Sequence, residues 1–113
     1  MTEPALFAQL KELLRPYLAG LSVKTDDETQ LYLEESQSTG KPQLFAAVQV
    51  KKSYVAFHLY PLYMHPELLA DLDPALRKRM QGKSCFNFTK PDQVPEAALA
   101  ALVERSYGML PPA

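Results

Sequence analysis

The amino-acid sequence predicts an α+β fold, in which a single antiparallel sheet of about five strands has the N- and C-terminal helices packed on one face. Apolar residues recur at spacings of three and four near both ends of the chain, and they alternate with polar residues between those ends. Prolines and glycines separate the segments. The length of 113 residues is that of one domain, which we take as residues 1–113.

The first helix is expected over residues 2–19. Thr2 is a suitable N-cap residue, and the first turn carries an acidic side chain that favours the positive end of the helix. Pro16 cannot donate a backbone hydrogen bond, so we expect the helix to loosen there before Gly20 ends it. The apolar stripe of this helix consists of Leu6, Leu10, Leu13, Leu14 and Tyr17.

Four strands are expected next, as two hairpins. Residues 21–24 and 30–34 alternate around an acidic turn, and residues 44–50 and 53–60 alternate in the same way. If Lys51-Lys52 is a two-residue turn, the apolar side chains of the second hairpin all lie on one side of the sheet. In that register Val50 faces Ser53, and Val48 faces Val55.

The rest of the chain predicts two short helices, a fifth strand and a closing helix. Proline stands at the first position of the helices expected over residues 66–71 and 74–80. Residues 84–89 alternate as a strand, and residues 95–107 return to helical spacing. The expected order of elements is therefore α-β-β-β-β-α-α-β-α.

The sheet face away from the helices is predicted to carry more aromatic surface than exposure alone explains. Alternation assigns to it Lys24, Tyr32, Glu34, Phe45, Gln49, Tyr54, His58, Tyr60 and Asn87. A ligand could stack on such rings and form a hydrogen bond with the imidazole. The predicted ligand-binding residues are Phe45, Tyr54, His58 and Tyr60 as a platform, with Lys83 and Asn87 at its rim. The alternative is that these side chains only stabilise the sheet as cross-strand pairs.

Charge is nearly balanced over the whole chain but uneven along it. The formal net charge is −1, with net −3 over residues 1–50, +4 over residues 51–90 and −2 over residues 91–113. Proteins that bind nucleic acid usually have a strongly basic balance, because they neutralise phosphates. We therefore expect no nucleic-acid partner.

No membrane association is expected either. The longest run without a charged residue, residues 53–66, has 14 residues, and a membrane-spanning helix needs about 20. The sequence opens without a basic segment before an apolar stretch, so a cytoplasmic location is expected.

No catalytic arrangement can be recognised in the sequence, so we do not expect an enzyme. Cys85 is the single cysteine and is expected to be structural, with activation of its thiol by Lys83 as the alternative. His58, His65 and Cys85 are the only soft ligands, and their spacing matches no known metal motif. The basic side chains of Arg77, Lys78, Arg79 and Lys83 are expected to be exposed to solvent. The alternative is that they bind a phosphate or an acidic partner.

Residues 44–50, LFAAVQV, residues 54–61, YVAFHLYP, and residues 76–88, LRKRMQGKSCFNF, resemble the YdhG-like family of small bacterial proteins of unknown function. The resemblance covers roughly residues 43–107. It implies a frataxin-like α/β sandwich, and some members of the family have been described as iron-binding proteins that support iron-sulfur cluster assembly.

The acidic residues provide the alternative that goes with this resemblance. Carboxylate oxygens bind hard cations, and the candidate iron ligands are Asp26, Asp27, Glu28, Glu34 and Glu35. A solvated hairpin turn is the competing interpretation. The leading expectation is a non-catalytic cytoplasmic domain without a cofactor. It would bind a small molecule, a partner protein or a second copy of itself on the aromatic face.

Overall fold

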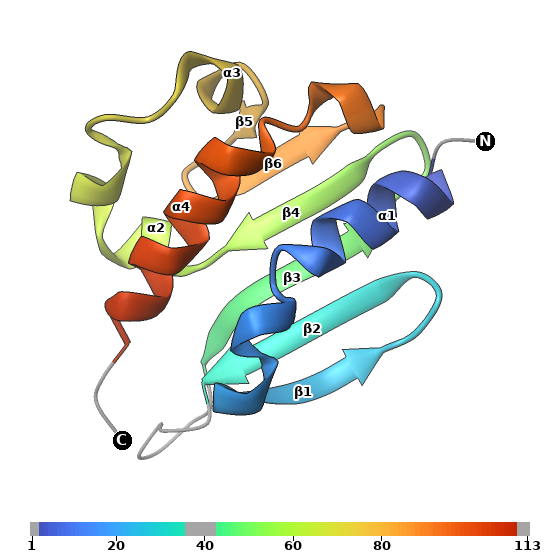
Figure 1. Ribbon diagram of the computed structural model, residues 1–113, viewed down its shortest axis with the longest axis horizontal. Helices are drawn as coiled ribbons and strands as arrows, with labels where there is room; N and C mark the ends of the chain where they lie inside the picture. The colour runs from blue at the N-terminus through green and yellow to red at the C-terminus, as the bar shows by residue number, and fades with distance from the viewer. Residues whose placement is uncertain (1–2, 36–42, 111–113) are drawn as a thin grey trace.

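A single antiparallel sheet of six strands lies at the centre of the computed structural model, which describes residues 3–35 and 43–110 (Figure 1). Its strand order is β1-β2-β3-β4-β6-β5. The strands are β1 (Leu21–Asp26), β2 (Gln30–Glu35), β3 (Leu44–Val50), β4 (Val55–Leu59), β5 (Met80–Gln81) and β6 (Cys85–Phe88). The predicted α+β class with one antiparallel sheet is confirmed.

The two longest helices, at the ends of the chain, lie on the same face of this sheet (Figure 1). The helical segments are α1 (Glu3–Glu12), η1 (Arg15–Gly20), α2 (Pro61–Met64), η2 (Pro66–Leu69), α3 (Pro74–Arg77), η3 (Pro91–Gln93) and α4 (Glu96–Gly108), where η marks a 3-10 helix. Even α4 has only 13 residues, and none of the helices in the described ranges is long and apolar enough to cross a membrane.

The predicted element order is wrong at two places. It lacks α2, which begins directly after β4, and it lacks β5, whose Met80 and Gln81 pair with Phe86 and Cys85 of β6. The sequence predicts Met80 as the last residue of the helix expected over residues 74–80. A strand of two residues is too short to show an alternating pattern, and only its pairing with β6 reveals it.

Helix α1 ends before the predicted boundary, in the way that Pro16 suggests. The α-helix stops at Glu12, and the chain continues from Arg15 to Gly20 as a 3-10 helix with Pro16 in its first turn. Gly20 allows a close approach, because a Cβ atom there would overlap the phenolic oxygen of Tyr107. The 3-10 helix η1 is thus packed against Tyr107 of α4.

The β3–β4 hairpin has a longer turn than predicted. Val50 pairs with Val55, not with Ser53, and the Lys51 N–H donates to the Tyr54 carbonyl at 2.8 Å. The two-residue turn is therefore wrong. The register differs from the predicted one by two residues, and an even shift keeps every side chain on its face. Because the turn is longer than predicted, Tyr54 belongs to the turn and not to β4.

An irregularity in β3 reverses the predicted orientation of Phe45. Leu33 pairs with Ala46 and Glu34 pairs with Leu44, so Phe45 has no partner in β2 and the alternation is interrupted. The Phe45 side chain is 0% exposed and meets the Tyr107 ring of α4. Its predicted place on the open face is wrong, because a bulge adds one residue to the strand and turns its side chain toward the helices.

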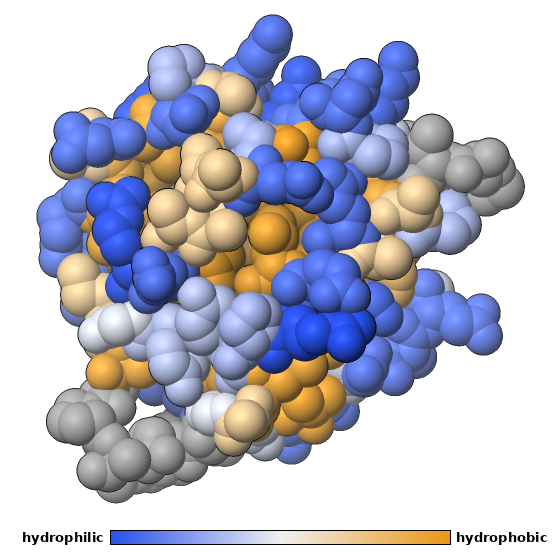
Figure 2. Space-filling model, viewed as in Figure 1, coloured by the Kyte–Doolittle hydropathy of each residue, from blue (hydrophilic) through white to orange (hydrophobic). Residues whose placement is uncertain are grey.

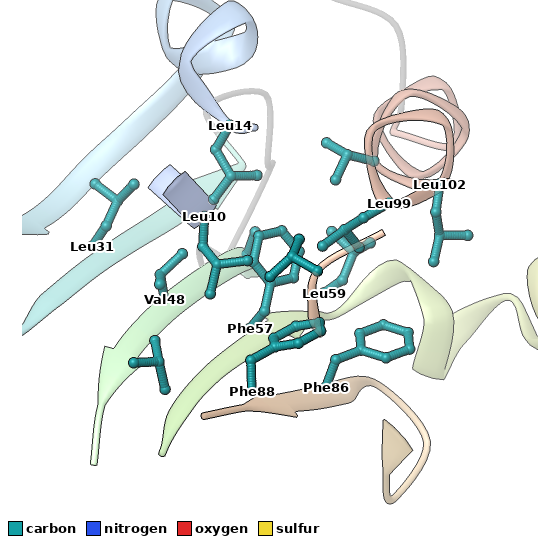
Figure 3. Packing of buried hydrophobic residues seen from close by; sticks show 14 of the residues in the cluster. Leu10, Leu14, Leu31, Val48, Phe57, Leu59, Phe86, Phe88, Leu99 and Leu102 are labelled. Atoms are coloured by element: carbon teal, nitrogen blue, oxygen red, sulfur yellow. The ribbon is translucent and has the colours of Figure 1, made fainter. Parts of the chain in front are cut away.

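The hydrophobic core fills the space between the sheet and the helices (Figure 3). Leu10 of α1 and Leu99 of α4 meet Phe57, Phe86 and Phe88, and each of the five is fully buried. Burial of one such side chain contributes about 1.5–3 kcal/mol. Inward orientation of Phe57, Phe86 and Phe88 agrees with the predicted alternation.

Candidate functional site

The sheet face opposite α1 and α4 is polar at its centre. His58 lies directly across from Cys85, and Ala56 from Asn87, in the pairing of β4 with β6. On the other side of β4, Ala47 pairs with His58 and Gln49 pairs with Ala56. We call His58, Ser84, Cys85 and Asn87 the polar face.

Two hydrogen bonds connect the side chains of the polar face. The Ser84 hydroxyl and the His58 Nε2 atom are 3.2 Å apart, and the Cys85 thiol donates to the Asn87 side-chain oxygen at 3.5 Å. Burial lowers the pKa of His58, so its imidazole is neutral at pH 7. Burial also raises the pKa of Cys85, an effect that the Lys51 ammonium partly offsets. Both groups are therefore uncharged at neutral pH.

The predicted platform does not form as one patch. Phe45 is buried beneath α4, and Tyr54 lies in the β3–β4 turn. The strand pairing places His58 and Asn87 on the polar face, as predicted. Tyr60 and Lys83, by contrast, lie at the end of the sheet where β4 ends and β6 begins.

Tyr60 and Lys83 are connected through Tyr63, a residue that the sequence analysis did not select. The rings of Tyr60 and Tyr63 are stacked with centroids 5.9 Å apart, and the Lys83 ammonium lies 5.9 Å from the Tyr63 centroid. Pro61 begins α2, and one helical turn places the side chains at positions 60 and 63 next to each other. Lys83 lies in the turn between β5 and β6. This turn is tight, and Gly82 in it has a φ angle of 77°.

Exposed apolar side chains surround these rings. Tyr60, Met64 and Met109 line a hollow of about 190 Å³. Tyr63 is 55% exposed, Met64 53% and Met109 37%. Among the residues that the structure describes, the large hydrophobic side chains with such exposure are these three and Val23. We call Tyr60, Tyr63, Met64, Lys83 and Met109 the aromatic corner.

Sequence reasoning missed Tyr63, Met64 and Met109 for an identifiable reason. We interpreted Pro61 as the end of a strand and assigned no structure to residues 61–65. A signal was present, because apolar and aromatic residues continue through Leu62, Tyr63 and Met64 without a polar residue. That run fits a helical turn with one buried and one exposed side.

The five candidate iron ligands are not brought together. Asp26 is 3.6 Å from the Lys11 ammonium, and Asp27 accepts hydrogen bonds within its own turn. Glu34 and Glu35 lie at the other end of β2, about 15 Å of extended chain away. Over residues 3–35 and 43–110, no group of three His, Cys, Asp or Glu side chains is placed to hold a metal ion.

Two other predicted groups have local partners. His65 Nδ1 lies 3.6 Å from the Glu67 carboxylate, just before η2. Arg77 donates to the Leu69 carbonyl at 3.0 Å and so fixes η2 beside α3.

Comparisons with known proteins do not identify this chain: no family model matches it, and neither a curated protein nor a solved structure does. The resemblance to the YdhG-like family therefore stays a prediction. Function has to be argued from the polar face and the aromatic corner themselves.

Proposed function

We propose that this chain is a non-catalytic protein-binding domain, and that its partner docks an apolar, acidic segment on the aromatic corner. The observation that carries the proposal is the gathering of Tyr63, Met64 and Met109 at one end of the molecule. Three of the four large exposed hydrophobic residues in the described part of the chain lie there.

The composition of the aromatic corner is that of an interface. Tyrosine and methionine are enriched where proteins meet, and flexible methionine side chains adapt to different partner surfaces. A contiguous exposed apolar patch on a small protein commonly marks an interaction site. The hollow of about 190 Å³ beside Tyr60 is smaller than the ~300–1,000 Å³ of typical small-molecule pockets, which favours a protein segment over a small ligand.

Lys83 supports an acidic group on the partner. Its ammonium lies against the Tyr63 ring, whereas Glu35 lines the hollow beside Tyr60. A carboxylate on the partner would meet Lys83 at the edge of the patch while an apolar side chain covers Met64. Such peripheral charges mainly accelerate association and select the orientation of the partner.

The state of the polar face supports binding rather than catalysis. A cysteine nucleophile reacts as the thiolate, with a neighbouring imidazole that accepts its proton. Burial shifts Cys85 and His58 the opposite way, toward a protonated thiol and a neutral imidazole that is a weak base. The two side chains therefore suit a structural role in the sheet.

Membership of the YdhG-like family and a frataxin-like arrangement belong to the same proposal. Their support is one antiparallel sheet with a helix from each end of the chain on one face. A cytoplasmic location is proposed with them, because the free thiol of Cys85 suits a reducing compartment.

The proposal is tested by photo-crosslinking in the cells that produce the protein. A benzoylphenylalanine in place of Tyr63 is expected to give one discrete adduct with a second protein. The control carries the same group in place of Ala97, an exposed residue on α4 about 18 Å along the helix from Met109. The control should give no such adduct, and Lys83→Glu should reduce the adduct formed at position 63.

Each other outcome has a definite meaning for the proposal. The absence of an adduct, or equal adducts at positions 63 and 97, would contradict a specific interface at the aromatic corner. An adduct with twice the mass of the chain would show that the corner binds a second copy, and would exclude a different partner protein.

A further inference from the structure

A second concave surface lies at the opposite end of β3 from the aromatic corner. It is a groove of about 820 Å³ between α1 and the turn that joins β1 to β2, with Val50 of β3 at its base. This volume falls in the range of ~300–1,000 Å³ that small-molecule sites occupy. On the helix-covered face, Figure 2 shows hydrophobic surface left open between hydrophilic residues.

One side of the groove is apolar. Pro4, Phe7 and Ala8 line it from one side of α1, at spacings of three and four, and Val50 lines it from the sheet. Phe7 is 6% exposed, so its ring is fixed by the core and not free to rotate into the groove. The apolar body of a small ligand would find a preformed surface here.

The other side of the groove is acidic. Asp26 ends β1, Asp27 and Glu28 follow it in the β1–β2 turn, and the only cation among the lining residues is Lys11. The lining therefore carries a formal net charge of −2. Over the part of the chain that the structure describes, the Glu28 carboxylate has no hydrogen bond or ion pair of its own.

The Asp27 carboxylate is held in place by its own turn. Its Oδ1 atom accepts hydrogen bonds from the Thr29 N–H at 2.8 Å, the Thr29 hydroxyl at 3.0 Å and the Gln30 N–H at 3.0 Å. These bonds lower the pKa of Asp27, so the turn carries its negative charge throughout the neutral range. Asp27 thus gives the acidic wall a charge in a fixed position.

Lys11 shows which chemistry the groove accepts. Its ammonium lies 4.6 Å from the centroid of the Phe7 ring and 3.6 Å from the Asp26 carboxylate. A cation is thereby already stabilised by a ring face and a carboxylate together at one end of the groove. The Glu28 carboxylate also lines the groove and forms no ion pair with Lys11.

We propose that this groove binds a small organic cation with an apolar body, such as an arylalkyl amine. The ammonium group would lie against Glu28 and Asp27, and the apolar body would cover Pro4, Ala8 and Val50. This occupant follows from the combination of an apolar wall with an uncompensated acidic wall. A bare metal ion would use the carboxylates alone, and an apolar anion would meet repulsion.

Binding of 2-phenylethylamine, followed by ¹H–¹⁵N correlation spectra of the whole protein, tests this proposal. We expect saturable shifts at the amides of Phe7, Ala8 and Glu28. The carboxylate analogue 3-phenylpropionate and the ring-free cation ethylamine should both bind at least about tenfold more weakly. Glu28→Gln should weaken 2-phenylethylamine binding about two- to fivefold, the effect expected of one exposed charge pair.

A matched control removes a charge elsewhere. Glu104→Gln on the exposed side of α4 should leave the affinity for 2-phenylethylamine unchanged. The proposal is overturned if 2-phenylethylamine causes no saturable shifts, or if 3-phenylpropionate binds as tightly. Equal shifts with magnesium chloride would also overturn it, because the apolar wall would then have no part in recognition.

Discussion

The ring of Phe45 in β3 meets the ring of Tyr107 in α4 edge-on, with centroids 5.8 Å apart and planes at 88°. This contact joins the centre of the sheet to the last turns of the closing helix. Tyr107 also lies 4.8 Å from the ring of Tyr17, which brings η1 into the same cluster. Phe45 therefore stabilises the fold and cannot act as a binding surface.

Truncation of Phe45 should strongly destabilise the protein. Phe45→Ala removes a fully buried ring, and such changes cost about 3–5 kcal/mol in the free energy of unfolding. Phe45→Leu, which fills more of the space, should cost less and keep the chain folded for measurement by urea denaturation. The exposed Tyr63→Ala serves as control and should change stability by under about 0.5 kcal/mol. A loss below about 1 kcal/mol for Phe45→Ala would contradict the burial of this ring.

Gly20→Ala is expected to destabilise the protein. The added Cβ of Gly20→Ala would overlap the Tyr107 phenolic oxygen, and the contacts of Tyr107 with Phe45 and Tyr17 keep that ring from moving aside. We expect a loss of about 1–3 kcal/mol in thermal or urea unfolding. Adding Tyr107→Phe to Gly20→Ala should restore part of that loss. Additive losses in the double variant would show that the overlap is relieved elsewhere.

His58 should make stability fall on mild acidification. The unfolded imidazole binds a proton near its ordinary pKa of 6.5, whereas burial holds the folded pKa lower. Below about pH 6.5 the unfolded state thus takes up more protons, and the free energy of unfolding decreases until the folded imidazole is also protonated. Urea unfolding at about pH 7.5 and about pH 5.5 should show a larger loss in the wild type than in His58→Gln. Equal losses would contradict the burial of this imidazole.

Cys85 should react slowly with thiol reagents. Its thiol is half-buried, and the raised pKa leaves little thiolate at about pH 8. Labelling by a chromogenic disulfide should be at least about tenfold slower in the native protein than in urea. Lys51→Gln should slow it further, because the nearby ammonium favours the thiolate. Native labelling at the unfolded rate would indicate an accessible, activated thiol.

Alternation predicted the faces of most strand residues, because an error of two residues in the β3–β4 register leaves orientation unchanged. Val48, Val55 and Phe57 therefore face the core as expected, and His58 and Asn87 lie opposite them. The N-cap role of Asp73 before α3 also follows from local chemistry, since its carboxylate accepts from the Ala75 N–H at 2.8 Å.

The parts that could not be predicted depend on contacts between distant segments. The bulge that turns Phe45 inward is visible only when β2 is aligned with β3. The partnership of Tyr63 with Lys83 requires the β5–β6 turn to return beside α2, a contact between residues 20 positions apart in the chain. Of the six predicted ligand-binding residues, only Tyr60 and Lys83 lie in the aromatic corner, and Tyr63, which contacts both, was not predicted.

The central claim, that the apolar side chains of the aromatic corner exist for a partner and not for the fold, is tested most directly by one comparison. Met64→Ser and Met109→Ser together should lower the photo-adduct formed at position 63 by at least about fivefold, because two exposed apolar anchors are lost. The same double variant should unfold at nearly the wild-type temperature, since neither side chain belongs to the buried core. An unchanged adduct yield in the correctly folded double variant would contradict the account.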